Sequence, residues 1–235
     1  MKKVLKITGI IILVTAIGIV AFLWAINEPL PNVAASPSKE ADALAHKMLH
    51  SLNYEAYKKT RYLEWTYRNG ANQYKWDKMM GQVDVRWSDI VVQLNLPDPT
   101  KSKAVVAGRA IKGEDKSKMV AKAIANFNND SFWLVAPFKV FDKGTQRSIF
   151  TNKDGSQSLL VTYTSGGSTP GDSYLWLLNN DGFPNGFKMW VKIIPVGGIE
   201  ASWDDWLVTE SGAFLPKSHA LGPLTLSMGD VRAYN

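Results

Sequence analysis

The sequence predicts an α+β fold: a transmembrane helix, then a strongly bent antiparallel sheet that forms an unclosed β-barrel with helices on its concave side. Three observations carry this prediction. A long apolar run opens the chain, and two later segments have helical periodicity. Most of the remaining sequence alternates apolar and polar residues, with turn signals between the alternating stretches.

The apolar run covers residues 4–26 and carries no charged residue or proline from Ile7 to Ile26. About 20 residues rising ~1.5 Å each cross the roughly 30 Å core of a bilayer. The charged residues before residue 7 are all lysines, which places the N-terminus in the cytoplasm. We therefore predict a signal-anchor at residues 1–26 in the bacterial inner membrane. The lipid bilayer is the expected partner of residues 7–26, and the C-terminal domain lies in the periplasm.

A cleaved signal peptide is the alternative, because Val33-Ala34-Ala35 fits the small-residue pattern of a cleavage site before Ser36. The apolar core of a signal peptide is shorter, usually about 7–15 residues, so a retained anchor is favoured. Residues 27–38 contain three prolines and no periodicity, which predicts a semi-rigid linker. One domain then occupies residues 39–235.

Composition excludes several classes of protein. Three of the 27 basic residues are the lysines before residue 7, so those that remain barely exceed the 21 acidic residues. This near balance predicts no nucleic-acid partner. The chain has no cysteine, which excludes a lipid-modified cysteine, disulfides, thiol nucleophiles and cysteine metal sites. We expect no cofactor.

Two segments have the 3.6-residue period of amphipathic helices. The first covers residues 37–54, with Ser36-Pro37 as its expected start and an apolar stripe at Ala41, Leu44, Ala45, Met48 and Leu52. The second covers residues 114–127, and 128–130 (Asn-Asn-Asp) is expected to be a cap or turn. Residues 131–142 form a dense apolar segment broken by Pro137, which predicts a short helix on or in the sheet.

Strands are expected where apolar residues recur at every second position, beginning with Leu63, Trp65 and Tyr67. Asn69-Gly70, residues 152–155 and residues 179–186 have the composition of turns. The expected strands lie at residues 63–68, 83–87, 90–96, 104–110, 147–151, 159–163, 174–178, 187–194, 203–209 and 224–228.

Two polar motifs were weighed as chemical sites. His46 and His50 share one helix face with Asp42, but two histidines leave a tetrahedral metal site unfilled, so solvated histidines are favoured and no metal is predicted. Asp204-Asp205 lies between two tryptophans, yet adjacent strand residues point to opposite faces and glycosidase carboxylates must flank one bond. A turn is favoured there, and no catalytic residue is predicted.

Tryptophan is the remaining signal, because eight of the nine lie beyond the apolar run. A solid aromatic core explains most of them. A bent sheet also leaves room between its concave face and covering helices, where large apolar side chains suit an acyl chain. The residues predicted to line such a cavity are Trp65, Trp76, Trp87, Trp133, Phe138, Trp176 and Trp190.

The order of these elements resembles the LolA-like group of envelope proteins, which includes a lipoprotein carrier and its receptor. The resemblance rests on an N-terminal helix, aromatic strands with YKWD at 74–77, and NDSFWLVAPFKVFD at 129–142. It implies an unclosed β-barrel plugged by helices, hydrophobic cargo between the two, and no enzymatic activity. It assigns no cargo-contacting residue. A retained anchor departs from the group and rules out free shuttling.

Three functions remain open. The first is an inner-membrane-anchored periplasmic domain that binds a hydrophobic ligand, such as a lipid or the acyl chain of a lipoprotein, with residues 37–54 and 114–141 moving as a lid. The second is a non-catalytic interaction module of an envelope assembly, with a filled core. The third is a hydrolase of envelope polymers, which needs converging carboxylates or a metal in a cleft.

Overall fold

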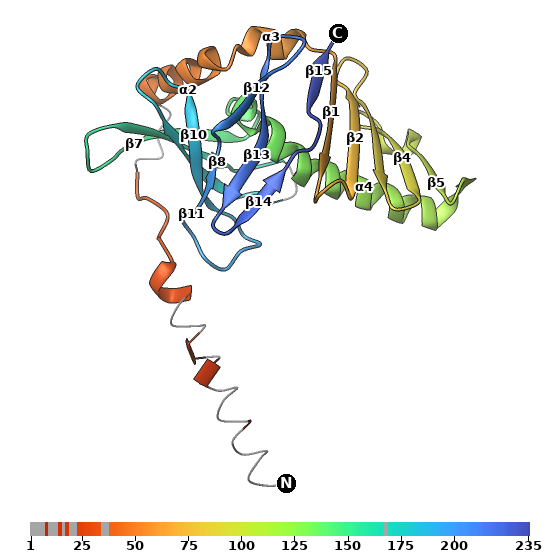
Figure 1. Cartoon of the computed structure of the whole chain (residues 1–235), viewed down its shortest axis with the longest axis horizontal. Coiled ribbons are helices and arrows are strands. Elements are labelled where there is room, and N and C mark those ends of the chain that lie inside the picture. The colour runs from red at the N-terminus through yellow and green to blue at the C-terminus, as the bar shows by residue number, and fades with distance from the viewer. Residues whose placement is uncertain (1–7, 9–13, 16, 19–22, 34–37, 167–168) are drawn as a thin grey trace.

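A computed structural model of the chain describes residues 8, 14–15, 17–18, 23–33, 38–166 and 169–235 (Figure 1). Most of the predicted anchor at 7–26 therefore lies outside the described residues, as do Ala35 of the alternative cleavage site and the expected helix start at Ser36-Pro37. Within the described part of the chain, no helix is long and apolar enough to cross a bilayer.

The domain is α+β and its strands pair antiparallel, as the sequence predicts. A seven-stranded sheet has the order β15-β1-β2-β3-β4-β5-β6, a five-stranded sheet β11-β10-β9-β8-β7, and a three-stranded sheet β12-β13-β14. Among the described strands, the sheets do not close into a barrel. The strands of the first half are β1 (Tyr62–Tyr67), β2 (Asn72–Asp77), β3 (Gln82–Trp87), β4 (Ile90–Asn95), β5 (Lys103–Val106), β6 (Arg109–Ala110) and β7 (Thr145–Thr151). Those of the second half are β8 (Gln157–Tyr163), β9 (Ser173–Leu178), β10 (Pro184–Trp190), β11 (Ile199–Ser202), β12 (Asp205–Val208), β13 (Phe214–Leu221), β14 (Leu224–Ser227) and β15 (Arg232–Tyr234).

The three sheets follow one another side by side, because the small sheet touches both of the others. Ala220 N at the end of β13 donates to Ser202 Oγ of β11 at 2.9 Å. Thr66 N of β1 donates to the carbonyl of Met228, directly after β14, at 2.9 Å. The layer therefore runs from β7 at one end to β6 at the other.

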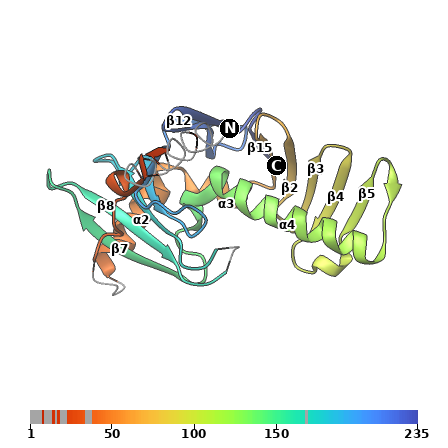
Figure 2. The ribbon, with the colours of Figure 1, turned by 90° about the horizontal axis from the view of Figure 1, so that it is seen from below.

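Helix α4 (Gly113–Val135) covers one face of the seven-stranded sheet and runs across β2–β5 (Figure 2). That face is apolar because side chains alternate along each strand: β1 buries Leu63, Trp65 and Tyr67 and turns its other residues outward. Val120, Ala123 and Phe127 of α4 are buried in the same core. The apolar stripe of α4, with its 3.6-residue period, therefore packs against the apolar face of the strands, whose period is two residues.

The first predicted helix, residues 37–54, corresponds to α2 (Lys39–Ser51). Asn53 at φ 53° separates α2 from α3 (Tyr54–Lys59), a helix that was not predicted. The N-cap of α2 is Ser38, whose hydroxyl accepts from Ala41 N at 3.0 Å. The apolar stripe is confirmed, since four of its residues are buried and Leu44 is partly buried. The stripe faces β7 and β8.

The expected cap or turn at residues 128–130 is wrong, because α4 continues through it to Val135. Asp130 is buried, and its carboxylate is bonded to β2 side chains instead of to the helix backbone. The local tendency of Asn and Asp to end helices is therefore overridden by a tertiary contact. Pro137 does end the helix, and a 3₁₀ turn follows (η2, Ala136–Lys139).

Most expected strands are present, with three corrections. The stretch 104–110 is a hairpin, β5 and β6, with Ala107 and Gly108 at positive φ in its turn. The stretch 187–194 is a strand only to Trp190, because residues 191–198 turn before β11. Three strands were not predicted: β11, β13 and β15. Strand β2 was expected only from the resemblance, which placed YKWD at 74–77 in a strand.

Candidate functional site

The seven predicted cavity residues lie in four places instead of one. Trp65, Trp76 and Trp87 line the face of the seven-stranded sheet that α4 covers. Trp133 and Trp176 belong to a second cluster at the other end of the core. Phe138 packs under α3, and Trp190 lies beside the linker that precedes the domain.

One gathering of rings lies between β1–β2 and α4, and we call its four residues (Trp65, Tyr74, Trp76 and Phe127) the aromatic interface. Trp65 stacks on Tyr74 with ring centroids 4.5 Å apart. Phe127 of α4 meets the edge of Trp76 at 5.2 Å and lies 6.2 Å from Trp65. Trp87 stands at the margin, where Lys122 of α4 lies 5.7 Å from its ring. These rings join the sheet to the helix.

The helix comes closest to the sheet at β4 and β5. Over β1 and β2 the space between helix and sheet is occupied by the four large rings of the aromatic interface.

Two indole N–H groups in the aromatic interface lack an acceptor. Within the described part of the chain, neither Trp65 Nε1 nor Trp76 Nε1 has a hydrogen-bond partner, although both atoms are buried. A buried donor without an acceptor costs about 1–3 kcal/mol. Trp176 Nε1, Trp203 Nε1 and Tyr163 Oη, elsewhere in the core, are buried and unpartnered in the same way. An oxygen atom from outside the protein would satisfy Trp65 Nε1 and Trp76 Nε1.

A buried polar group ties α4 to β2 beside these rings. Asp130, which is 1% exposed, accepts from Asn72 Nδ2 at 2.7 Å and from Tyr74 Oη at 2.5 Å. Its second oxygen accepts from Asn129 Nδ2 at 2.8 Å. We call Asn72, Tyr74, Asn129 and Asp130 the Asp130 cluster. Among the described residues, no basic side chain forms an ion pair with Asp130, so hydrogen bonds alone satisfy its carboxylate.

The nearby phenols stay protonated. Burial, and then the hydrogen bond to Asp130, raise the pKa of Tyr74 well above its usual value. Burial, with a smaller contribution from Asp130, raises the pKa of Tyr67 to about 12. The Tyr74 hydroxyl therefore remains a donor to Asp130 at every physiological pH.

His219 forms a second polar tie at the same end of α4, because it bonds to Trp133, three residues after Asp130. It is fully buried on β13; its Nδ1 lies 2.8 Å from the Ser202 carbonyl and its Nε2 2.7 Å from the Trp133 carbonyl. Both neighbours are acceptors, so the neutral ring satisfies only one of them. Burial nevertheless lowers the pKa of His219, against the opposing effect of these two carbonyls.

The second aromatic cluster surrounds Phe187 of β10. Trp176 and Trp203 are fully buried and meet at 5.0 Å, while Trp133 lies 5.6 Å from Phe187. Every ring there touches at least one other ring, and His219 contacts Trp203 at 4.4 Å. This cluster is a packed core that joins the five-stranded sheet to the end of α4.

The last two predicted residues have structural partners of their own. Phe138 stacks on Tyr57 of α3 with centroids 3.9 Å apart. Trp190 donates its indole N–H to the Glu28 carbonyl at 2.7 Å. Trp190 therefore lies outside the core interface and contacts the predicted linker.

The other motifs from the sequence do not converge. His46 stacks on Phe141 at 4.5 Å, and no group of three metal-binding side chains occurs within the described ranges. Asp205 begins β12 and accepts from Ser218 Oγ at 2.7 Å, whereas Asp204 is exposed in the connection before it. An open hollow of about 230 Å³ lies on the outer face of β1–β3, lined by Glu64, Gln73, Tyr74, Lys75, Asp84 and Arg86. Its charged side chains make cross-strand pairs such as Lys75–Glu64 at 3.0 Å.

Sequence reasoning missed Asp130 and His219. Asp130 has the composition of a turn, and no pattern in the sequence marks His219. A signal for Asp130 does exist, because it extends the buried positions Val120, Ala123 and Phe127 by the helical spacing.

Comparison with known proteins gives no family assignment. No protein-family model matches the chain, and no curated protein matches it.

Proposed function

We propose that this chain is a membrane-anchored envelope protein whose exported domain binds a hydrophobic ligand between α4 and the concave face of an unclosed β-barrel. The ligand class is a lipid or the acyl chain of a lipoprotein. The anchor is residues 7–26, with the N-terminus in the cytoplasm and the domain in the periplasm. Catalysis has no part in this proposal.

The buried, unpartnered indole N–H groups of Trp65 and Trp76 carry the proposal. An acyl chain supplies apolar surface for the rings, and its ester or carboxyl oxygen supplies the missing acceptor. Apolar rings and donors without an acceptor occur together at the aromatic interface.

Helix α4 is suited to move as a lid because its polar ties are concentrated at one end. Asp130 and the Trp133 carbonyl are bonded to β2 and β13 in its last turns. Its first half rests on apolar contacts and on a solvent-exposed bond from Lys116 Nζ to the Thr100 carbonyl at 2.9 Å. The helix begins at Gly113, whose φ is +62°. Opening is therefore expected to begin at the first half of α4, and the bonds of residues 130–135 oppose it.

An interaction module with a filled core is the second candidate. The cluster around Phe187 favours it, because Trp176 and Trp203 are fully buried and packed ring against ring. In that case the aromatic interface is a core as well, and function resides on the outer surface.

Photocrosslinking separates the two candidates. The full chain is reconstituted in lipid nanodiscs that contain a trace of phospholipid with a photoreactive acyl chain, and crosslinked peptides are mapped by mass spectrometry. Crosslinks within residues 1–26 report the anchor and serve as an internal control. We expect additional crosslinks within residues 62–77 and 113–135.

A matched pair of variants sharpens the result. Ala123 is fully buried on the inner face of α4, and Ala125 is exposed. Ala123→Phe fills the interface and should abolish the crosslinks in the domain, while Ala125→Phe should leave them unchanged. Crosslinks confined to the anchor and to neighbouring surface loops in the unmodified chain would refute the ligand site and favour the interaction module.

A further inference from the structure

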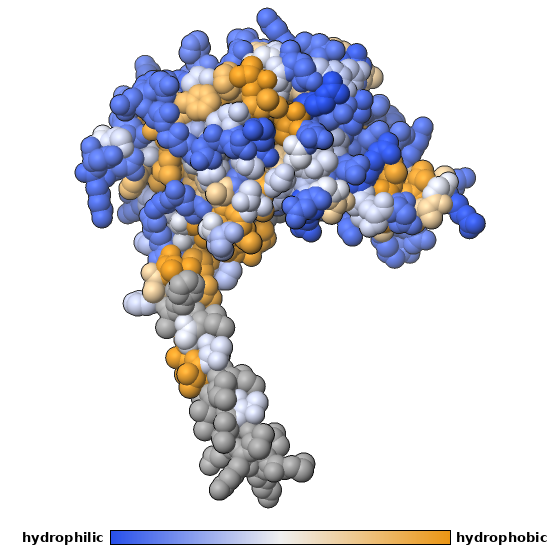
Figure 3. All heavy atoms as spheres, in the orientation of Figure 1, coloured by the Kyte–Doolittle hydropathy of each residue, from blue (hydrophilic) through white to orange (hydrophobic). Residues whose placement is uncertain are grey.

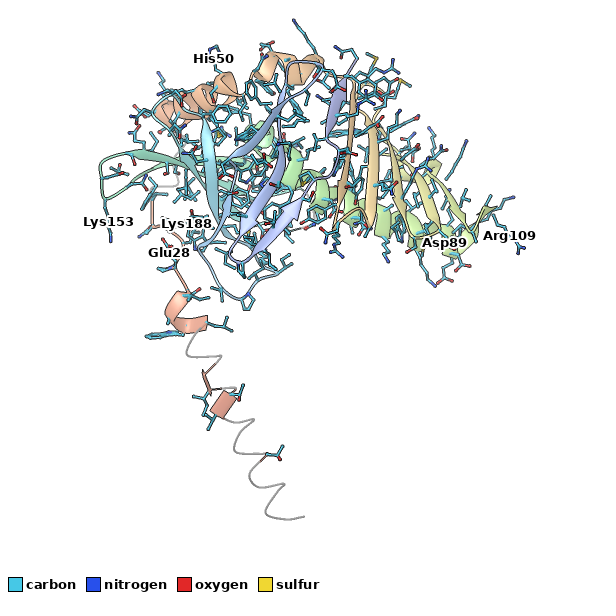
Figure 4. The ribbon with its side chains drawn as sticks, viewed as in Figure 1. Glu28, His50, Asp89, Arg109, Lys153 and Lys188 are labelled. Carbon is cyan, nitrogen blue, oxygen red and sulfur yellow. The ribbon has the colours of Figure 1, made fainter. Side chains whose placement is uncertain are left out.

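The start of the predicted linker is hydrogen-bonded to the loop between β10 and β11. Glu28 N donates to the Gly197 carbonyl at 3.1 Å, and Gly197 N donates to Asn27 Oδ1 at 2.9 Å. The Glu28 carbonyl accepts the indole N–H of Trp190, and the Glu28 carboxylate pairs with Lys188 Nζ at 2.7 Å. We call these five residues the Glu28 junction; Glu28 and Lys188 are labelled in Figure 4.

Two glycines permit this close approach. A Cβ on Gly197 would lie 2.3 Å from Trp190 Cδ1 and 2.7 Å from the Glu28 carbonyl oxygen. A Cβ on Gly198, which has φ +77°, would lie 2.4 Å from Glu28 Cβ. All three distances are far shorter than van der Waals contact. The loop is therefore shaped to receive the chain that leaves the N-terminal helix.

The junction places this loop beside the end of the predicted anchor. Trp24 is in helical conformation, and Asn27 N bonds back to its carbonyl at 3.4 Å. Four residues span at most about 14 Å even when extended, so Glu28 lies within that distance of Trp24. Each polar layer of a bilayer is only about 5–8 Å thick. A helix that ends in that layer near Trp24 keeps the bonded loop at or next to the membrane surface.

The loop carries the side chains that such a position favours. Ile193 is 71% exposed, and Trp24, at 82%, faces solvent on the helix end. Lys192 is exposed beside Ile193, and its ammonium donates to the Pro170 carbonyl. Leu224, the first residue of β14, is 60% exposed. Figures 1 and 3 show the β10–β11 loop and an apolar patch on the side of the domain from which the N-terminal helix leaves.

We infer that the loop of residues 191–198 is a membrane-docking site, with Ile193 inserted in the headgroup layer of the bilayer that holds the anchor. The occupant of this exposed apolar surface is the lipid bilayer. The inference rests on the anchor in the proposed function and is independent of the ligand site. It assigns to the Glu28 junction the task of fixing the domain's orientation on the membrane.

Spin labels measure this directly, because the chain has no cysteine of its own. The full chain is reconstituted in phosphatidylethanolamine–phosphatidylglycerol vesicles with a single label at Ile17→Cys, Ile193→Cys or His50→Cys. His50 lies on the side of the domain away from the N-terminal helix (Figure 4). The collision rates of each label with oxygen and with a water-soluble nickel chelate then give its depth. We expect the label at 17 to be deep, that at 193 shallow but in lipid, and that at 50 in water.

The depths of the three labels test the docking site and the anchor separately. A label at 193 that matches the label at 50, while the label at 17 is deep, overturns the docking site and leaves the anchor intact. A label at 17 in water overturns the anchor and the docking site together. Gly197→Ala combined with the label at 193 is a further test: breaking the junction should raise collisions with the nickel chelate several-fold. An unchanged depth at 193 would show that the junction does not position the loop.

Discussion

Removal of the Asp130 carboxylate should loosen α4 by an amount that the structure lets us work out. In Asp130→Ala, the buried donors of Asn72 and Tyr74 lose their acceptor, which costs about 1–3 kcal/mol each. Relief of the carboxylate's own desolvation offsets part of this loss. We expect a net decrease in the free energy of unfolding of about 2–4 kcal/mol.

A double-mutant cycle isolates the hydrogen bond itself. Tyr74→Phe should cost about 1.5–3 kcal/mol in the unmodified chain, because it removes one bond to a buried charged acceptor. In the Asp130→Ala background the same change should cost nothing, since the Tyr74 hydroxyl is already unpaired. Denaturant unfolding of the full chain in detergent micelles, followed by tryptophan fluorescence, gives all four free energies. An equal cost of Tyr74→Phe in both backgrounds would refute this account of the Asp130 cluster.

The same substitution should accelerate opening of the interface. A cysteine at Ala123, which is fully buried, reacts with a thiol reagent only when α4 lifts. A loss of 2 kcal/mol that falls on the lid corresponds to labelling about 30-fold faster. A cysteine at Ala125 is exposed and should be labelled at the same rate with or without Asp130. Unchanged labelling at Ala123 would show that the Asp130 cluster does not hold the lid.

Three further predictions concern other parts of the fold. Because burial lowers the pKa of His219, the unfolded chain binds the proton more tightly, and stability should fall as pH drops through the unfolded pKa of about 6.5. Thermal unfolding between pH 7.5 and 5 should show a fall in Tm, and His219→Gln should make that fall smaller. Parallel plots of Tm against pH for the two proteins would contradict this prediction. Gly186→Ala would place a Cβ 2.8 Å from the Ala201 carbonyl oxygen and should lower stability by about 1–3 kcal/mol; an unchanged denaturation midpoint would argue against that close contact. Arg147→Lys loses the Nε–H that donates to Asp42 at 2.6 Å and the Nη1–H that donates to the Val140 carbonyl at 2.8 Å, and it should cost about 1–2 kcal/mol. In an Asp42→Ala background, the part of that cost that comes from the bond to Asp42 should vanish.

Periodicity predicted the elements whose two faces differ in environment. Strand β1 shows strict alternation of buried and partly buried residues from Tyr62 to Tyr67, and the stripe of α2 is buried against β7 and β8. In both cases the apolar face points at the core and the polar face at water. A single sequence therefore records which side of the element is covered.

The elements that were missed are those in which a local signal opposes the tertiary structure. Strand β13 contains Pro216, which argues against a strand; it is tolerated opposite the register shift between Asp205 and Trp206. In α4 the turn-forming residues 128–130 continue the helix because Asp130 bonds to β2. Neither partner is near in sequence, so no local pattern reveals it.

The candidate site was likewise predictable only in part. That tryptophans would fill the core was predictable, but their separation into distinct clusters depends on sheet order, which places Trp65 beside α4 and Trp176 beside Trp203. Trp190 follows the alternation of its neighbours, yet its partner Glu28 lies in the linker. The sequence shows which side chains are large and aromatic, whereas the fold decides which of them come into contact.

An open layer of strands has two ends, and here the ends are unlike. One end is β6, only two residues long, which offers an incoming chain little backbone to pair with. The other end is β7, seven residues long, whose outer N–H and C=O groups form a template for aggregation. Arg147, in the middle of β7, points its guanidinium inward to Asp42 and the Val140 carbonyl. A charge held inside an edge strand makes a flat, continuous extension of the sheet unfavourable, so Arg147 helps to keep neighbouring copies of the protein from pairing edge to edge.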